Sequence, residues 1–434
     1  MPAFTHTSNQ HSNLSLTSIA GFKIFFVFGF AYFLSYAFRA VNAVIAPDLI
    51  ADLGMSNSVL GLLSSAYFVG FALMQLPLGV WLDKYGSRRT ESVLLIFGVM
   101  GSLLFAWAES VLWVATGRGF IGIGVSACLM ASFTAYRQWF KPEQQGSLAS
   151  GMLVFGTMGA LMTTIPTQAL LPFVGWRGMF YIMAILVAIA AIGIRFGLPK
   201  TADPESVERS IQVTSDKKSF LSGYGAIFKN GHFLQMLPVG MFNQGGFIAI
   251  QTLWLGPWLK YVVGQPDNQV AMTLFIYNLI LLSGYLVNTW FVPRVNKKGI
   301  STFTYSAVIS GIALATEVIA VLTPGQHSTF WWYFFGLCAT SFILGQSLVQ
   351  TNFPKNITGR VNTAYNLMLF VGAFIVQWGI GWLIDFLMSF NIEKATAFTY
   401  AMLMLLAIQT LSYIWMWLAP KVLKPEVFVF KEAD

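Results

Sequence analysis

The sequence predicts an all-α integral membrane protein with twelve transmembrane helices in two six-helix bundles. Only 10% of its 434 residues are charged and 56% are hydrophobic, whereas soluble domains carry about 25% charged residues. Apolar stretches of the ~20 residues that a membrane helix needs recur along the chain. The Lys and Arg residues gather in alternate connections between these stretches. Together these observations exclude a soluble enzyme, a disordered protein and a single-span receptor.

The expected spans are too long for barrel strands, which need only about 10 residues with strict alternation. Helices also satisfy their own backbone groups in lipid. We expect spans at residues 22–46, 57–81, 90–108, 112–135, 147–172, 178–198, 232–255, 269–292, 301–322, 329–351, 361–384 and 397–419.

These spans divide the chain into five parts. Residues 1–21 form a polar cytoplasmic tail, and residues 22–198 form the N-terminal six-helix bundle. The charged residues 199–231 form a cytoplasmic linker. Residues 232–419 form the C-terminal bundle, and residues 420–434 form a second cytoplasmic tail.

Basic residues give the orientation. Twenty of the 25 Lys and Arg residues fall on one side if the N-terminus is cytoplasmic, and three, Arg177, Lys260 and Lys394, fall on the other. Positive charge favours the cytoplasmic side. We therefore expect both termini in the cytoplasm and the protein in the cytoplasmic (inner) membrane. The basic residues lie beside the membrane, which excludes a nucleic-acid partner.

The loop after the second span combines a carboxylate, glycines and a basic cluster, at Gly79, Asp83, Lys84, Gly86, Arg88 and Arg89. Gly79 would permit close helix approach, and Asp83 could meet a helix N-terminus or a basic partner. Such a latch can form in one conformation and break in another. The alternative is an ordinary basic cytoplasmic loop.

With this loop pattern the chain resembles the major facilitator superfamily, whose signature between helices two and three is similar. The fourth span opens Gly117-Arg118-Gly119, like the buried arginine and small residues of the family's fourth helix. The second half has a degenerate copy of the loop, with Asn296 in place of Asp83. The resemblance implies two six-helix bundles, a central cavity and alternating access by rocking of one bundle against the other.

Arg39 is the most informative single residue because an arginine inside a span is costly unless it faces a cavity or a partner. Helical spacing places it on a polar stripe with Tyr32, Ser35, Tyr36 and Asn42. Its guanidinium matches a carboxylate or phosphate. Snorkelling to the outer headgroups and a structural pair are the alternatives.

The arginine in the first helix is similar to that of two organic-anion branches of the family, the anion:cation symporters and the organophosphate antiporters. Those branches use it for substrate. The resemblance also implies that Arg118 faces the cavity, although hydrogen bonding to neighbouring helices is an equal alternative for it. Two arginines without an obvious acid would leave a positive pocket, which favours an anionic substrate.

Amide and aromatic side chains supply the rest of the expected binding site, at Tyr67, Gln244, Tyr277, Asn278, Gln346 and Asn366. Each amide alone is more typical of an interhelical hydrogen bond. Together they form a neutral polar wall opposite the arginines, which suits a substrate with a negative end and a hydrogen-bonding body.

We therefore expect a secondary transporter that imports a small organic anion, a carboxylate or a phosphorylated metabolite, by rocker-switch alternating access. Efflux of drugs or metabolites by proton antiport is the main alternative. It is disfavoured by Thr157, which stands where the family's drug exporters usually have proline. A transporter-like sensor is a further alternative. No enzymatic motif, cofactor or metal site is expected.

The coupling ion stays open between a proton and sodium. No acid follows Arg118 within its span, Glu91 is assigned to the cytoplasmic loop, and Glu317 is interpreted as an interface or external-end residue. The expected partners are a small anionic substrate and the lipid bilayer, and we expect a monomer.

Overall fold

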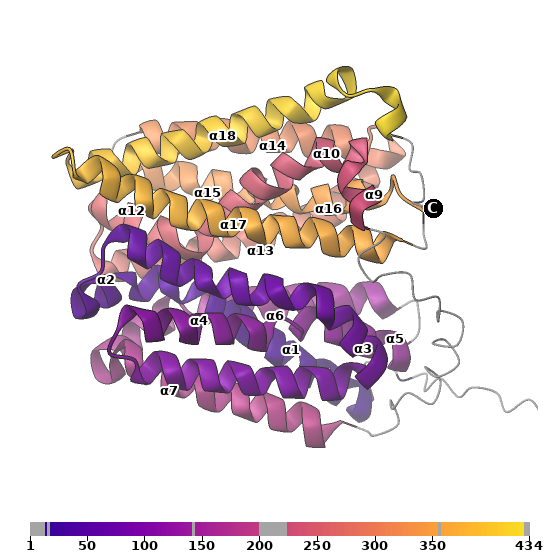
Figure 1. Cartoon of the computed structure of the whole chain (residues 1–434), viewed down its shortest axis with the longest axis horizontal. Coiled ribbons are helices and arrows are strands. Elements are labelled where there is room, and N and C mark those ends of the chain that lie inside the picture. The colour runs from indigo at the N-terminus through magenta and orange to yellow at the C-terminus, as the bar shows by residue number, and fades with distance from the viewer. Residues whose placement is uncertain are drawn as a thin grey trace, which may run out of the picture.

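The computed structural model describes residues 14, 18–140, 144–198, 224–323, 325–354 and 357–428, and these fold into helices arranged in two halves. Figure 1 shows α1 to α7 below and α9 to α18 above, with the helices of both halves running in roughly the same direction. Within these described residues, ten helices are long and apolar enough to cross a membrane. The protein is therefore a multi-pass membrane protein.

The N-terminal half begins with a helix that is interrupted once. The break lies at Val41, between α1 and α2. The elements of this half are α1 (Ile19–Ala40), α2 (Asn42–Leu53), α3 (Asn57–Trp107), α4 (Val111–Val125), α5 (Cys128–Trp139), α6 (Gln145–Met162) and α7 (Ile165–Gly197).

The C-terminal half begins with α9, which lies inside the segment expected to be a linker. Its elements are α9 (Tyr224–Lys229), α10 (Gly231–Pro238), η3 (Val239–Gln244), α11 (Gly245–Ala249), η4 (Ile250–Trp254), α12 (Leu255–Tyr261), α13 (Asp267–Lys297), α14 (Thr302–Leu322), α15 (His327–Ala339), η5 (Thr340–Ile343), α16 (Leu344–Gln350), α17 (Thr358–Met388), α18 (Lys394–Val422) and η6 (Pro425–Phe428).

Two long helices of the N-terminal half turn at a glycine. Gly86 inside α3 has φ 75° and Gly175 inside α7 has φ 64°, a left-handed conformation that glycine adopts without a steric penalty. Gly86 lies in the loop after the second span, between the two helical parts of α3. The fifth span is interrupted at Thr163 and Thr164, between α6 and α7, and its second part runs from Ile165 to the turn at Gly175.

The seventh span is not one regular α-helix. Two π-helical segments, η3 and η4, flank the short segment α11. π-helical turns are rare and occur frequently at functional sites. One face of this broken helix packs against the rest of the C-terminal half. Residues on its other face line a cavity between the two halves.

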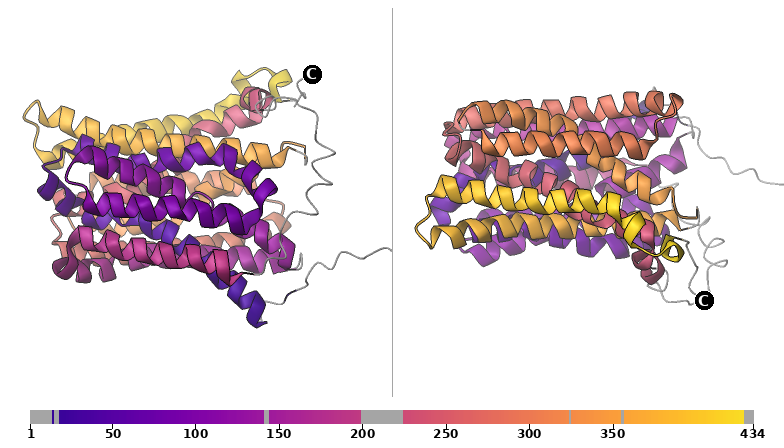
Figure 2. Two further views of the ribbon diagram at one scale, coloured as in Figure 1. Left: turned by 60° about the horizontal axis from the view of Figure 1, so that its bottom comes forward. Right: turned by 90° about the horizontal axis from the view of Figure 1, so that it is seen from above.

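The two halves meet closely at the end of the molecule away from the start of α1 and the end of α18 (Figure 2). There the Asp385 carboxylate of α17 accepts hydrogen bonds from the first backbone amides of α3, Asn57 N at 3.1 Å and Ser58 N at 2.5 Å, and from Asn57 Nδ2 at 2.9 Å. We call this set of contacts the Asp385 clamp. A carboxylate is favourable at a helix N-terminus because it satisfies unpaired N–H groups and the helix dipole.

Glycines allow backbones of the two halves to touch beside the Asp385 clamp. A Cβ on Gly61 would lie 2.6 Å from the Gln377 carbonyl oxygen, and one on Gly381 would collide with the Asn57 carbonyl. Small residues permit such close helix approach in membrane proteins. The clamp and these glycines together hold this end of the molecule closed.

A second carboxylate at the same end acts within the N-terminal half alone. Asp52 of α2 accepts from Trp176 Nε1 at 2.9 Å and pairs with Arg177 Nη1 at 2.9 Å, both on α7. The Trp176 hydrogen bond and the Arg177 pair hold the pKa of Asp52 below its usual range. The contact ties α2 to α7 without crossing to the other half.

Candidate functional site

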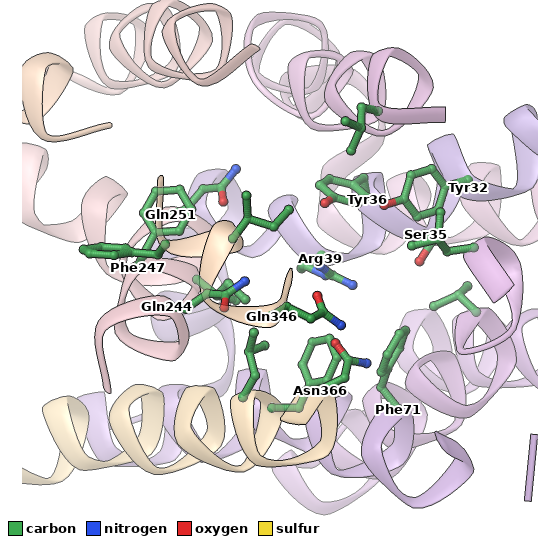
Figure 3. Close-up of a pocket in the computed structure, with 18 of the residues that line it drawn as sticks. Tyr32, Ser35, Tyr36, Arg39, Phe71, Gln244, Phe247, Gln251, Gln346 and Asn366 are labelled. Carbon is green, nitrogen blue, oxygen red and sulfur yellow. The ribbon is translucent and has the colours of Figure 1, made fainter. Parts of the chain in front are cut away.

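A cavity of about 170 Å³ lies between the two halves. Polar lining comes from α1 and α3 of the N-terminal half and from the broken seventh span, α13, α16 and α17 of the C-terminal half. Figure 3 shows Arg39 in the middle of the cavity, with Tyr32, Ser35 and Tyr36 on one side and Gln244, Phe247 and Gln251 on the other.

The Arg39 guanidinium sits in a cage of aromatic rings. Its central carbon lies 4.8 Å from the ring centroid of Tyr36, 5.9 Å from Tyr67, 5.6 Å from Phe71 and 5.5 Å from Phe370. Cation–π contacts of this kind stabilise a cation partly withdrawn from water. Phe370 belongs to α17, so both halves build the cage.

Arg39 lacks a counter-ion within the described part of the chain. Its Nε is buried without a hydrogen-bond partner, and no ion pair is found for it among the described residues. Aromatic faces attract the cation but do not neutralise it. The guanidinium thus keeps its positive charge and an unused donor next to the cavity, which is the arrangement that an anion would complete.

Amides line the cavity around Arg39. Gln244, Gln346 and Asn366 are placed there as the sequence predicted. Asn366 Nδ2 donates to Gln75 Oε1 of α3 at 3.3 Å and so joins the halves. Gln346 Nε2 donates to Asn362 Oδ1, while the buried Gln244 Oε1 has no partner in the described structure.

Five expected site residues lie outside the cavity lining. The Asn42 Nδ2 donates to Ser64 Oγ at 2.8 Å, which is an interhelical contact. Asn278 accepts from Gln251 Nε2 at 3.2 Å and so stands one contact behind the lining. Tyr277 is fully buried elsewhere in the C-terminal half.

Tyr67 and Arg118 form a layer behind Arg39. The Tyr67 ring centroid lies 5.9 Å from the Arg39 guanidinium carbon and 5.5 Å from that of Arg118. Arg118 is 1% exposed, and its Nε and Nη1 have no hydrogen-bond partner in the described structure. The cavity lining excludes it, so its charge acts from behind the aromatic ring.

The sequence did not indicate every residue of the cavity. Tyr285 of α13, Phe71, Phe247 and Phe370 all line it. Aromatic residues occur throughout apolar spans, so in the sequence these four resemble many others. They are distinguished only in the structure, where they lie at the contact between the two halves.

The loop after the second span is described only in part. The Asp83 side chain lies outside the described residues, so its latch contact stays a prediction. No atom lies within 4 Å of a Cβ built on Gly79, so no helix approaches closely there in this conformation. Arg88 Nη1 donates to the Leu198 carbonyl at 3.2 Å, which joins the loop to the end of α7.

Comparison with known proteins shows one family across most of the chain. The family model of the Major Facilitator Superfamily matches residues 28–377. The chain is 22% identical over 399 residues to the probable galactarate/D-glucarate transporter of Escherichia coli strain K12, covering 82% of this chain and 87% of that protein. It is 22% identical over 389 residues to the cis,cis-muconate transport protein of Acinetobacter baylyi, covering 87% and 91%. A crystal structure of a D-xylose-proton symporter superposes with a TM-score of 0.70 at 16% identity, covering 92% of this chain and 97% of that one.

Proposed function

The chain belongs to the major facilitator superfamily, and on that premise we propose that it imports a small organic anion with a carboxylate group, anchored by Arg39. The observation that carries this proposal is the uncompensated guanidinium in an aromatic cage at the cavity between the halves. Two relatives support a carboxylate, since one is a probable galactarate/D-glucarate transporter and the other is a cis,cis-muconate transport protein.

The size and lining of the cavity support a metabolite rather than a drug. Its volume of about 170 Å³ is below the ~300–1,000 Å³ typical of pockets for drug-sized ligands. Gln244, Gln346 and Asn366 offer donors and acceptors for the hydroxyl or carbonyl groups of a polar body. Arg118 would strengthen the positive potential from behind Tyr67.

The proposed mechanism is alternating access by rocking of two six-helix bundles, with twelve crossings of the cytoplasmic membrane by a monomer. Ten of the twelve crossings would be the long apolar helices. The other two would be α6 in the N-terminal half and the broken run from α10 to α12 in the C-terminal half. Both termini would lie in the cytoplasm. The Asp385 clamp would then face outside and would have to open to admit substrate.

Counterflow in proteoliposomes tests the substrate class. Vesicles loaded with D-glucarate, cis,cis-muconate, a sugar phosphate, a neutral sugar or an organic cation are diluted into the labelled form of the same compound. We expect exchange of a carboxylate only. Arg39→Gln removes the charge and should abolish exchange, whereas Arg39→Lys keeps the charge, loses the fork geometry and should weaken binding roughly 10- to 100-fold, the equivalent of ~1.5–3 kcal/mol.

Exchange of only neutral or cationic compounds, unchanged in Arg39→Gln, would overturn the anion assignment. Uptake by right-side-out vesicles in the absence of internal substrate tests the direction. Strict dependence on an outward gradient would instead indicate export.

A further inference from the structure

The C-terminal half contains a carboxyl group that the substrate site does not use. Glu317 of α14 is 0% exposed and lies at the interface of α14 with α18. No described Lys, Arg or His forms an ion pair with it. Burying an unpaired carboxylate is strongly unfavourable, so such a group binds a proton instead.

One amide from another helix meets the Glu317 carboxyl. With its nitrogen turned toward the carboxyl, the Gln409 amide of α18 donates to Oε2 at 3.1 Å and to Oε1 at 3.2 Å. Gln409 is itself 0% exposed. An amide can donate to either form of the acid and, when reversed, can accept from the protonated form. This neutral partner therefore tolerates both protonation states without fixing one.

Titratable groups around Glu317 are few. The helices packed against α14 carry Tyr277 and Tyr285 on α13, Tyr333 and Cys338 on α15, and Tyr400 and Tyr413 on α18 within their spans. Of these, Tyr277 interacts electrostatically with Glu317, and its hydroxyl has no hydrogen-bond partner in the described structure. All are neutral groups at physiological pH, so the charge at this place is decided by Glu317.

Gln409 connects Glu317 to the helix that lines the cavity. Its backbone carbonyl accepts from Asn243 Nδ2 at 3.3 Å. With the amide nitrogen turned toward Glu317, the amide oxygen takes the position 3.0 Å from a Cβ built on Gly246. A Cβ at position 246 would therefore press on this amide. Asn243 and Gly246 belong to η3 and α11, and their neighbours Gln244 and Phe247 line the cavity.

The short segment α11 thus has the cavity on one face and Gln409 with Glu317 on the other. It lies between two π-helical segments, where hydrogen bonding departs from the regular α pattern. A change of charge behind this segment and an anion in front of it act on the same backbone. Two ligands that bias one element are coupled, and the coupling is reciprocal.

We propose that Glu317 is a proton-binding site that lies back to back with the anion cavity across α11, so that anion binding and proton binding favour each other. This inference rests on the proposed anion transport and extends it to the coupling ion. Anion binding therefore raises the fraction of Glu317 that holds a proton, and loss of the anion lowers it, so that a proton is carried with the anion and released with it on the other side.

Infrared spectroscopy of the reconstituted protein tests the proton site without a known substrate. We expect a protonated-carboxyl carbonyl band near neutral pH that titrates away at high pH and is absent in Glu317→Gln. Glu91→Gln is the matched control, because Glu91 is an equally buried carboxyl, 0% exposed, in the N-terminal half. It should leave the Glu317 band in place. A wild-type spectrum that matches Glu317→Gln overturns the proposal.

Transport of labelled D-glucarate tests the coupling. Glu317→Gln should retain counterflow, which needs no net proton movement, but should lose accumulation driven by an inside-alkaline pH gradient. Accumulation equal to that of wild type in Glu317→Gln overturns the coupling. If neither wild type nor variant exchanges D-glucarate, this substrate assignment fails, while the infrared band still decides whether Glu317 holds a proton.

Discussion

The Asp385 clamp predicts which conformation the empty protein prefers. Asp385→Asn keeps the shape of the side chain but removes its negative charge. Two backbone amides at the start of α3 then donate to a neutral group instead of a carboxylate. Hydrogen bonds to a charged group are worth ~1.5–3 kcal/mol and neutral ones ~0.5–1.5 kcal/mol. Replacing two hydrogen bonds to a charged acceptor by two to a neutral one therefore destabilises the closed state by about 1–3 kcal/mol.

This cost converts into a population. Each ~1.4 kcal/mol is a factor of ten in an equilibrium constant, so Asp385→Asn should raise the ratio of open to closed molecules at this end about 5- to 100-fold. Spin labels at Ala51 and Asn391, both exposed at this end on opposite halves, report the distance between the halves. Cys128 and Cys338 are replaced by alanine so that only the two chosen sites react.

Asp52→Asn is the matched control for the clamp. It removes a carboxylate at the same end of the molecule, but its contacts with Trp176 and Arg177 stay within the N-terminal half. The distance distribution should therefore remain that of the parent protein. An unchanged distribution in Asp385→Asn, or an equal shift in both variants, would refute the assignment of the clamp.

Two further predictions concern the same end of the molecule. Gly381→Ala places a methyl group against the Asn57 carbonyl and should shift the spin-label distances in the same direction as Asp385→Asn; a distribution like that of the parent contradicts close packing there. The lowered pKa of Asp52 adds stability that is present above the pKa of the unfolded chain and is lost as the pH falls through the lower, folded value. Because the side chain is half exposed, the effect is about 0.2–1 kcal/mol; thermal unfolding in acid should lose this increment in wild type but not in Asp52→Asn.

Helical periodicity was sufficient to predict one wall of the cavity. Tyr32, Tyr36 and Arg39 line it because they share a face of α1 at three- and four-residue spacing. Asn42 follows the same spacing but lies beyond the interruption at Val41 and bonds to Ser64 instead. A local break in a helix is not visible in the pattern of polar residues.

The fifth span contains a similar interruption, between α6 and α7. Thr163 Oγ1 donates to the Ala160 carbonyl and Thr164 Oγ1 to the Leu161 carbonyl. Such side-chain hydrogen bonds compete with the helical ladder, so α6 stops at Met162 although the apolar sequence continues. Hydropathy predicts which segments lie in the membrane, but it does not predict where side-chain hydrogen bonds interrupt a helix.

Buried acids were the hardest groups to place from sequence. Glu91 was assigned to a loop, yet it is 0% exposed inside α3, with both carboxyl oxygens lacking a hydrogen-bond donor in the described structure. Its surroundings include Cys128 of α5, a residue far from it along the chain. Burial at a helix–helix contact depends on which face meets the neighbour, and that is decided by tertiary packing.

The layered arginines have a consequence for the electrical behaviour of the protein. Arg39 and Arg118 belong to the N-terminal half, and both guanidinium groups contact the Tyr67 ring. No described carboxylate forms an ion pair with either of them. In the proposed rocking of the empty halves these charges would shift within the membrane potential, and a full crossing costs about 2.3 kcal/mol per charge at 100 mV. A bound dianion cancels them. Voltage should therefore act on the return of the empty carrier and hardly on the loaded step, so pre-steady-state currents would separate the two halves of the cycle.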